Sequence, residues 1–80
     1  MSNENSFYRI SDLALIVTIS IFHPIEDVDK TNPRRVFFVF KKNKALDELI
    51  DKYWRQELRV DPQRFFAQLK IVKSRIYEHR

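Results

Sequence analysis

The segment RVFFVFKK, residues 35–42, decides the fold because it is the clearest β-strand in the chain. Successive side chains of a strand point to opposite faces of its sheet. Residues 36, 38 and 40 therefore share one face, and Phe37 and Val39 share the other. Both faces are apolar, so two interpretations of Phe37 and Val39 stay open. Either they meet a partner, a second copy of the chain or the N-terminal arm, or they are simply covered within the domain.

A hairpin is the natural arrangement for this strand. The short acidic segment Ile25–Asp29 precedes it, and the turn-forming cluster Lys30–Pro33 separates the two runs. Because the chain contains no glycine, we expect every tight turn to be made by Asn, Asp or Pro. The same absence excludes the glycine-rich loops that cradle phosphate groups.

The first of three expected helices is Leu13–Phe22. Its content is apolar and largely β-branched, so periodicity alone does not separate a buried helix from a buried strand. The pair Ser11-Asp12 offers an N-cap, and the length of ten residues also favours a helix. The helix ends at His23-Pro24, because the residue before proline avoids the α region.

The second and third helices have clear start signals. Asn43 is a good N-cap for a helix that we expect to end near Glu57, and Asp61-Pro62 starts a helix that runs to about Tyr77. The apolar residues of the second helix follow the spacing of one buried face: Leu46, Leu49, Ile50, Tyr53 and Trp54.

These elements predict a small α+β domain of order α-β-β-α-α. A two-stranded antiparallel hairpin packs with three helices in one globular domain spanning residues 7–80. Residues 1–6 are polar and are expected to be disordered. Residues 7–10 alternate weakly and are expected to form a short extended arm.

The composition argues against catalysis. With no cysteine, the chain has neither disulfides nor thiolate ligands, and His23 and His79 lie in different elements without acids at ligand spacing. The hairpin acids Glu26, Asp27 and Asp29 form a divalent-cation site in principle, but charges that protect a sheet edge explain them more simply. We therefore predict no enzyme activity, no metal, no cofactor and no small-molecule substrate.

The apolar run Leu13–Phe22 does not predict a membrane segment. Its ten residues are too few to cross a bilayer, which needs about 20. A secretory signal is disfavoured because Glu4 and Asp12 lie where positive charge belongs. We therefore expect a cytoplasmic protein without a membrane partner.

Residues 62–80 carry the excess positive charge of the chain. Five cations face a single acid, Glu78, so the segment has a net charge of +4, equal to the formal net charge of the whole protein. The cations are Arg64, Lys70, Lys73, Arg75 and Arg80. An apolar series at helical spacing runs between them: Phe65, Phe66, Leu69, Val72, Ile76 and Tyr77. Such a helix is expected to pack its apolar side on the core and to present its cations together to solvent.

A second basic group lies at the hairpin, comprising Lys30, Arg34, Arg35, Lys41, Lys42 and Lys44. Lysine and arginine supply the phosphate contacts that dominate affinity for nucleic acid. Our leading hypothesis is a non-catalytic binding module that contacts DNA or RNA phosphates with little sequence preference. The residues predicted to make these contacts are Arg34, Arg35, Arg64, Lys70, Lys73 and Arg75.

Five short motifs carry a family resemblance: SDLAL at 11–15, NPRRV at 32–36, FVF at 38–40, YW at 53–54 and KIVKSRIY at 70–77. Together, over residues 7–77, they resemble a family of small bacterial and phage domains of unknown function. The resemblance implies the α-β-β-α-α order and a helical Leu13–Phe22, and it implies no catalytic residue. The chain departs from the family at Phe22-His23, where relatives usually have a glycine before the hairpin.

The alternative hypothesis is a protein-interaction module. It is motivated by the second apolar face of the hairpin strand, with Phe37 and Val39 as the interface residues. The expected partner is then a second copy of the chain, or a host protein bound by a phage accessory or inhibitor protein.

Overall fold

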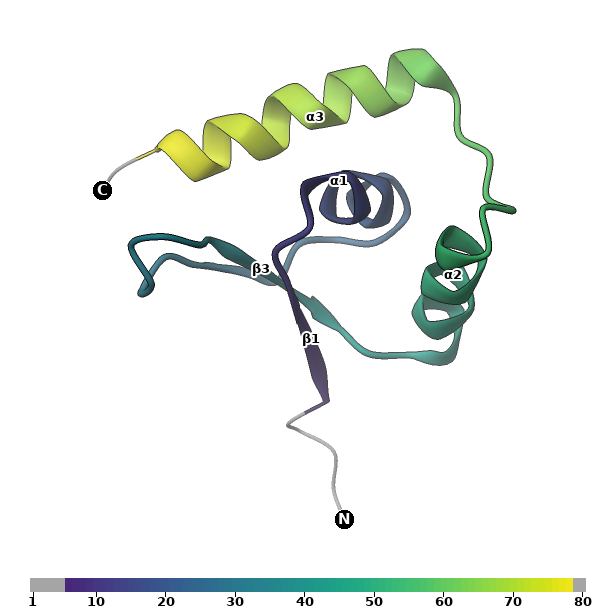
Figure 1. Cartoon of the computed structure of the whole chain (residues 1–80), viewed down its shortest axis with the longest axis horizontal. Helices are drawn as coiled ribbons and strands as arrows, with labels where there is room; N and C mark the ends of the chain where they lie inside the picture. The colour runs from purple at the N-terminus through teal and green to yellow at the C-terminus, as the bar shows by residue number, and fades with distance from the viewer. Residues whose placement is uncertain (1–5, 79–80) are drawn as a thin grey trace.

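The computed structural model describes residues 6–78, and its three helices all lie on one side of a three-stranded antiparallel sheet (Figure 1). The elements are β1 (Phe7–Ile10), α1 (Leu13–Phe22), β2 (Asp27–Asp29), β3 (Phe37–Lys41), α2 (Lys44–Trp54) and α3 (Pro62–Tyr77). The predicted α+β class and the three predicted helices are confirmed. The predicted disorder of the N-terminus falls mostly on residues 1–5, which lie outside the described residues.

The prediction of a two-stranded hairpin is wrong by one strand. The strand order is β1-β3-β2, with Tyr8 opposite Phe40 in one pairing and Val28 opposite Phe38 in the other. The hairpin leaves the backbone groups on the second edge of β3 unpaired, and Phe7–Ile10 pairs with that edge instead of forming a separate arm. The Ser6 carbonyl extends the pairing by accepting a hydrogen bond of 3.0 Å from the Lys42 N–H.

The two faces of the sheet differ in their surroundings. The register places Phe7, Arg9, Phe37 and Val39 on one face, which we call the outer face, and Tyr8, Ile10, Val28, Phe38 and Phe40 on the inner face. Phe38 and Phe40 are fully buried, whereas Phe37 and Val39 are only half-buried. The helices cover the inner face alone.

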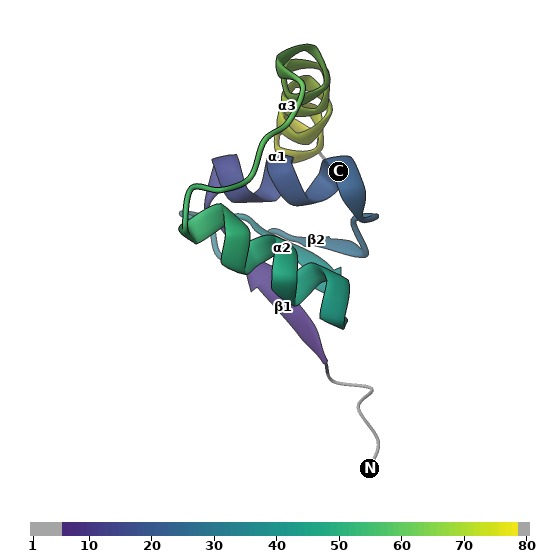
Figure 2. The same cartoon turned by 90° about the vertical axis from the view of Figure 1, so that its right-hand side faces the viewer.

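The position of α1 explains why its sequence has no polar side. A helix that is apolar all round must be covered on more than one side. Figure 2 shows α1 between α3 and the sheet, in three tiers, with residues 15–19 of α1 buried. Asp12 caps the helix by accepting from the Leu15 N–H, and His23 ends it in extended backbone, both as predicted. The buried Thr18 hydroxyl donates to the Ala14 carbonyl at 2.8 Å, so no polar atom of this side chain lacks a partner.

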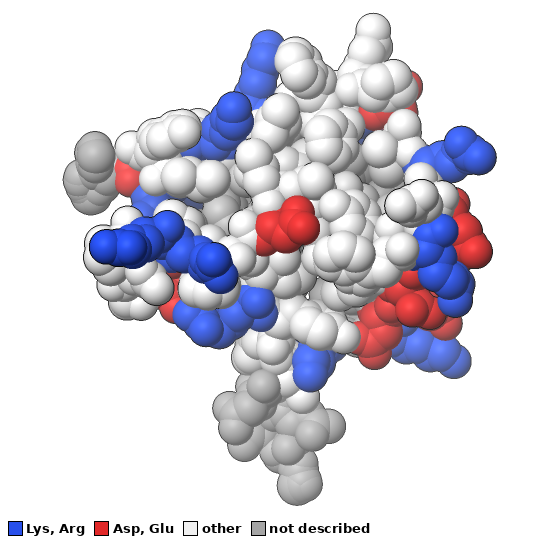
Figure 3. Space-filling model, in the orientation of Figure 1, with Lys and Arg blue, Asp and Glu red and all other residues white. Residues whose placement is uncertain are grey.

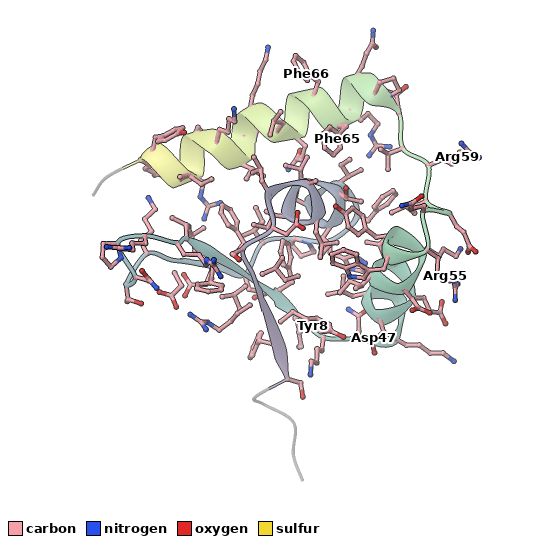
Figure 4. All side chains as sticks on the ribbon, viewed as in Figure 1. Tyr8, Asp47, Arg55, Arg59, Phe65 and Phe66 are labelled. Carbon is pink, nitrogen blue, oxygen red and sulfur yellow. The ribbon has the colours of Figure 1, made fainter. Side chains whose placement is uncertain are left out.

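The core is a single cluster drawn from α1, β3, α2 and α3. Its buried members are Leu15, Ile16, Val17, Ile19, Phe38, Phe40, Leu46 and Val72. α2 supplies only Leu46 to it and is tied to β1 by a hydrogen bond from the Tyr8 hydroxyl to Asp47 Oδ1 (Figure 4). That hydrogen bond, together with desolvation and the Asp47 charge, raises the pKa of Tyr8 above its usual value.

Two expectations about α2 are wrong. Trp54 was expected on the buried face but is 61% exposed, because the helix ends at this residue and its ring lies edge-on to Tyr53 at 5.1 Å. The helix ends three residues before Glu57 in a Schellman motif: the Gln56 N–H donates to the Tyr53 carbonyl and the Glu57 N–H donates to the Lys52 carbonyl. Gln56 has a φ of 62°, so a tight turn is made by a residue other than Asn, Asp or Pro.

α3 has the predicted bounds and start. Asp61 caps it by accepting from the Arg64 N–H at 3.0 Å, and Pro62 is its first residue. Figure 4 shows Phe65 pointing toward α1 and Phe66 pointing away from it. Phe66 and Tyr77 were both expected in the apolar series that packs on the core, yet they are 60% and 71% exposed. Only Val72 of this helix is fully buried. None of the helices in residues 6–78 has the length and apolar content that crossing a membrane requires.

Candidate nucleic-acid interface

The loop between β2 and β3 holds two exposed arginines in a turn built by side chains. Asn32 Oδ1 accepts from the Arg34 N–H at 2.9 Å, and the Asn32 carbonyl accepts from the Arg35 N–H at 3.3 Å. Pro33 occupies the second position of this turn, where its fixed φ is favourable. Arg34 and Arg35 follow directly and are both exposed. The turn therefore presents two neighbouring positive charges without a glycine.

Asp29 fixes the start of the same loop. Its Oδ1 accepts from the Thr31 N–H at 3.0 Å and from the Thr31 hydroxyl at 2.7 Å, while its Oδ2 accepts from Arg9 Nη2 at 2.7 Å. These hydrogen bonds lower the pKa of Asp29 to about 2, and the two from Thr31 contribute more than the one from Arg9. The carboxylate is thus committed to the loop and to β1.

The loop and the C-terminal end of α3 meet at an open groove of about 760 Å³. Asp27, Val28 and Lys30 line one side, and the last turn of α3, residues 75–78, lines the other. Lys30 Nζ donates a hydrogen bond to the Glu78 carbonyl, so a side chain of the loop also contacts the end of the helix. Figure 1 shows the end of α3 above the tip of the hairpin. The structure therefore brings Lys30 of the hairpin group and Arg75 of the α3 group to one groove, together with the acids Asp27 and Glu78.

The predicted cations of α3 do not share one side of the helix. Each residue turns an α-helix by about 100°, so Lys70 and Lys73 lie within about 60° of each other. Arg64 and Arg75 share a different side, about 120° or more from the two lysines. Arg64, Lys70 and Lys73 are exposed, whereas Arg75 is half-buried and its Nε lies 3.8 Å from Glu78 Oε1. The expectation of one common cationic side is wrong, because the buried stripe of α3 lies between the two groups on the helix circumference.

Figure 3 shows how the charged side chains are distributed over one face of the molecule. Positive side chains gather around the hairpin, at the left of the view, and a smaller positive group projects from α3 at the top. Positive and negative side chains are mixed over α2, at the right. The hairpin and α3 are therefore the parts of this face with an excess of positive charge.

The predicted interface residues Phe37 and Val39 lie together on the outer face of the sheet. The Arg9 guanidinium lies over the Phe37 ring, with Cζ 4.3 Å from the ring centroid. Phe7 of the same face is 41% exposed. The outer face is thus apolar at its centre and partly covered by a side chain from β1.

Residues 5–78 match the protein family described as "Domain of unknown function (DUF5659)". The chain belongs to this family. The match confirms the resemblance to a family of unknown function that the sequence motifs indicated. No curated protein and no solved structure matches the chain.

Three residues of the candidate interface in this DUF5659 domain were not predicted as site residues. Lys30 and Tyr77 line the groove, and Arg9 covers Phe37. Lys30 belonged to the basic group of the hairpin, which was the available signal. Tyr77 follows Phe66 by eleven residues, three helical turns, and this spacing could have placed both on one side. Nothing in the sequence pointed to Arg9, because it lies over Phe37 only when β1 pairs with β3 as a third strand.

The hairpin acids of the DUF5659 domain do not converge. Asp29 is bound to Thr31 and Arg9, whereas Asp27 faces the groove and its Oδ1 accepts from the Val28 N–H at 2.9 Å. Within the part of the chain that the structure describes, no three His, Cys, Asp or Glu side chains are grouped as metal ligands. The chemistry that the groove offers is hydrogen bonding and charge.

Proposed function

We propose that this DUF5659 domain is a non-catalytic binding module that contacts the phosphates of nucleic acid. The single observation that carries the proposal is the groove at which Lys30 of the hairpin loop bonds to the C-terminal end of α3. It brings one cation of the hairpin, Lys30, and one cation of α3, Arg75, to the same groove, which supports a binding surface shared by the two elements. A cytoplasmic location, proposed from the sequence, is consistent with such a partner.

The contacts are assigned by exposure and by position relative to the groove. Arg34 and Arg35 lie on a turn that their own backbone N–H groups help to close, and both side chains are exposed to solvent. Lys70 and Lys73 extend the positive surface along α3. Arg75 lines the groove. Arg64 lies toward the other end of α3 and on a different side from the lysines, so it is not assigned a contact here.

Such contacts predict affinity without sequence preference and with strong salt dependence. Each phosphate neutralised by a protein cation releases bound counterions, and the logarithm of the binding constant falls by about 0.9 per contact for each tenfold rise in salt. The groove contributes no base-reading pattern of several convergent polar side chains among the described residues.

The test is a pair of charge-reversed variants measured against a labelled duplex oligonucleotide by fluorescence anisotropy. The variant R34E/R35E removes two proposed contacts. The control K52E/R59E changes the net charge equally at exposed residues of α2 and of the connection that follows it, where Figure 4 labels Arg59 far from the hairpin. We expect R34E/R35E to weaken binding to all sequences and to lower the salt slope by about two. The control should bind like the wild type at ~100 mM salt, where long-range charge effects are screened beyond about 10 Å.

Two results would overturn the proposal. One is no binding by the wild type at ~50 mM salt, where phosphate contacts are strongest. The other is an equal loss of affinity in both variants, which would mean that net charge, not this surface, attracts the nucleic acid.

The second candidate function is protein interaction through the outer face of the sheet. One observation favours it: all three helices lie on the inner face, so Phe7 is 41% exposed and Phe37 and Val39 are half-buried with no helix over them. The partner is a second copy of the chain or another protein. The variant Phe37→Glu is then expected to fold and to lose association in light scattering, whereas Phe66→Glu on α3 retains it. A Phe37→Glu variant that unfolds would make this residue part of the core and remove the motive.

A further inference from the structure

Two aromatic side chains of α3 are exposed to solvent although aromatic residues usually supply buried area. Phe66 is 60% exposed and Tyr77 is 71% exposed. Burial of an aromatic side chain favours folding, so two rings left largely in water contribute little to the stability of this small domain. A single exposed ring is ordinary, but apolar side chains that gather on one side of an element mark a surface for contact with another molecule.

The two rings lie on one stripe of the helix with two lysines between them. Phe66, Lys70, Lys73 and Tyr77 are spaced at i, i+4, i+7 and i+11, which keeps all four within about 60° of one another. All four are exposed. Lys70 Nζ lies 5.8 Å from the centroid of the Phe66 ring, so one cation is held beside an aromatic face. The rings are about 16 Å apart along the helix axis.

Tyr77 also lines the groove that the hairpin loop shares with α3. The two cations Lys30 and Arg75 and the two acids Asp27 and Glu78 lie around it there, and Val28 and Ile76 supply apolar surface. A flat ring beside an apolar wall suits a heterocyclic base, whereas the balanced charges of the groove leave the phosphate contacts to the lysines of the stripe. The stripe thus runs from Phe66, over two lysines, into the groove.

Resting on the proposed function, we infer that the bound nucleic acid is single-stranded and that Phe66 and Tyr77 stack on its bases. Aromatic platforms interleaved with cations are the common means of binding single strands without sequence preference, because every base has a π-face and every nucleotide a phosphate. Bases inside a duplex are already stacked and paired, so they offer no face to a side chain on a helix surface. The lysines of the stripe lie between the rings, where the connecting phosphates pass.

If the partner is single-stranded, the domain should prefer a single strand to a duplex, and simple charge attraction does not produce this preference. The probes are a fluorescein-labelled oligodeoxythymidylate and a duplex of the same length, titrated by anisotropy at the same salt. We expect the wild type to bind the single strand more tightly than the duplex. Phe66→Ala and Tyr77→Ala should each lower the affinity for the single strand by roughly 5- to 100-fold and change the affinity for the duplex less than twofold. Tyr77→Phe, which keeps the ring, should bind the single strand like the wild type.

The matched control is Trp54→Ala. Trp54 is exposed to the same extent as Phe66, 61% against 60%, but lies at the end of α2. Its loss should leave both affinities unchanged. Because Phe66, Tyr77 and Trp54 are all largely exposed, none of these variants is expected to unfold, and a thermal melt by circular dichroism checks this.

The outcomes distinguish this inference from the proposed function. If neither oligonucleotide binds, the proposed function fails and the inference fails with it. If the duplex binds as tightly as the single strand, or if the two alanine variants bind like the wild type while R34E/R35E does not, the inference alone is overturned. Binding to phosphatidylserine vesicles with no binding to either oligonucleotide would assign the aromatic and basic stripe to a membrane surface and overturn both.

Discussion

Arg9 Nη2 lies 2.7 Å from Asp29 Oδ2, and this ion pair joins the two edge strands of the sheet, β1 and β2, across the central strand β3. Arg9 lies opposite Val39 in the β1–β3 pairing, and Asp29 lies opposite Phe37 in the β2–β3 pairing. The guanidinium therefore passes over Phe37, with Cζ 4.3 Å from the ring centroid. The arrangement fixes the hairpin loop, because the same carboxylate also accepts both hydrogen bonds from Thr31.

Because the pKa of Asp29 is lowered in the folded protein, we predict that its contribution to stability is lost in acid. Its pKa in the folded protein is about 2, below the value of about 3.9 for an aspartate in an unfolded chain. A lowered pKa contributes stability that is complete above the unfolded value and is lost as the pH falls through the folded value. We expect the difference in Tm between the wild type and Asp29→Asn to be present at pH 6, to shrink below about pH 4 and to vanish only below about pH 2. Thermal melts across this range measure it.

The control for this prediction is Asp51→Asn. Asp51 pairs with Arg55 at 3.2 Å, but both side chains are more than half exposed, and surface pairs contribute little to stability. The Asp51→Asn variant should follow the wild type at every pH. A difference between Asp29→Asn and the wild type that persists unchanged down to pH 2 would show that Asp29 acts through its shape and not through its charge.

Local signals in the sequence were sufficient for the helices. Asp12, Asn43 and Asp61 each cap a helix by accepting the N–H three residues later, and these caps depend only on neighbouring residues. The alternation in residues 36–40 likewise placed Phe38 and Phe40 on one face and Phe37 on the other, as the register confirms, but it did not decide which face is buried. Caps and alternation are properties of short segments, so one sequence is enough to find them.

The third strand and the groove depend on contacts between distant residues. Phe7–Ile10 is too short to predict as a strand by itself, and its partner β3 lies about thirty residues away. The groove exists because α3 crosses above the hairpin, which brings Tyr77 and Arg75 beside Lys30. Gln56 was missed for a different reason: a left-handed residue is expected to be glycine, and this chain has none.

The substitution Gln56→Gly is predicted to stabilise the domain. Gln56 has a φ of 62° at the end of α2, a region in which a Cβ atom costs roughly 1–2 kcal/mol and glycine is unstrained. Part of the gain is offset by the greater freedom of glycine in the unfolded chain. We expect the free energy of unfolding to rise by about 1 kcal/mol and Tm to rise by about 4–8 °C. Glu48→Gly, at an exposed position inside α2, should instead lower stability by about 1 kcal/mol. Equal effects of the two variants would contradict the argument from φ.

Phe38 and Phe66 are predicted to differ sharply in their contribution to stability. Phe38 is fully buried between the sheet and α1, so Phe38→Ala should cost about 3–5 kcal/mol. This is a large part of the roughly 4–12 kcal/mol expected for a domain of this size. Phe66→Ala removes an exposed ring and should change stability by less than about 0.5 kcal/mol. Urea unfolding of both variants measures the difference. A large loss in Phe66→Ala would mean that the ring packs within the domain and is not free to contact a ligand.

The turn that carries Arg34 and Arg35 predicts a change of affinity without a change of charge. Asn32→Ala removes the oxygen that accepts from the Arg34 N–H at 2.9 Å, so the two arginines must be ordered when nucleic acid binds. Ordering a side chain at an interface costs about 0.5–1.5 kcal/mol, so we expect affinity to fall by roughly 2- to 10-fold. The salt slope should stay that of the wild type, since both cations are still present. Asn32→Ser, whose hydroxyl forms the same kind of turn more weakly, should recover part of the loss. A changed slope in Asn32→Ala, or an unchanged affinity, would mean that the turn does not position the arginines for binding.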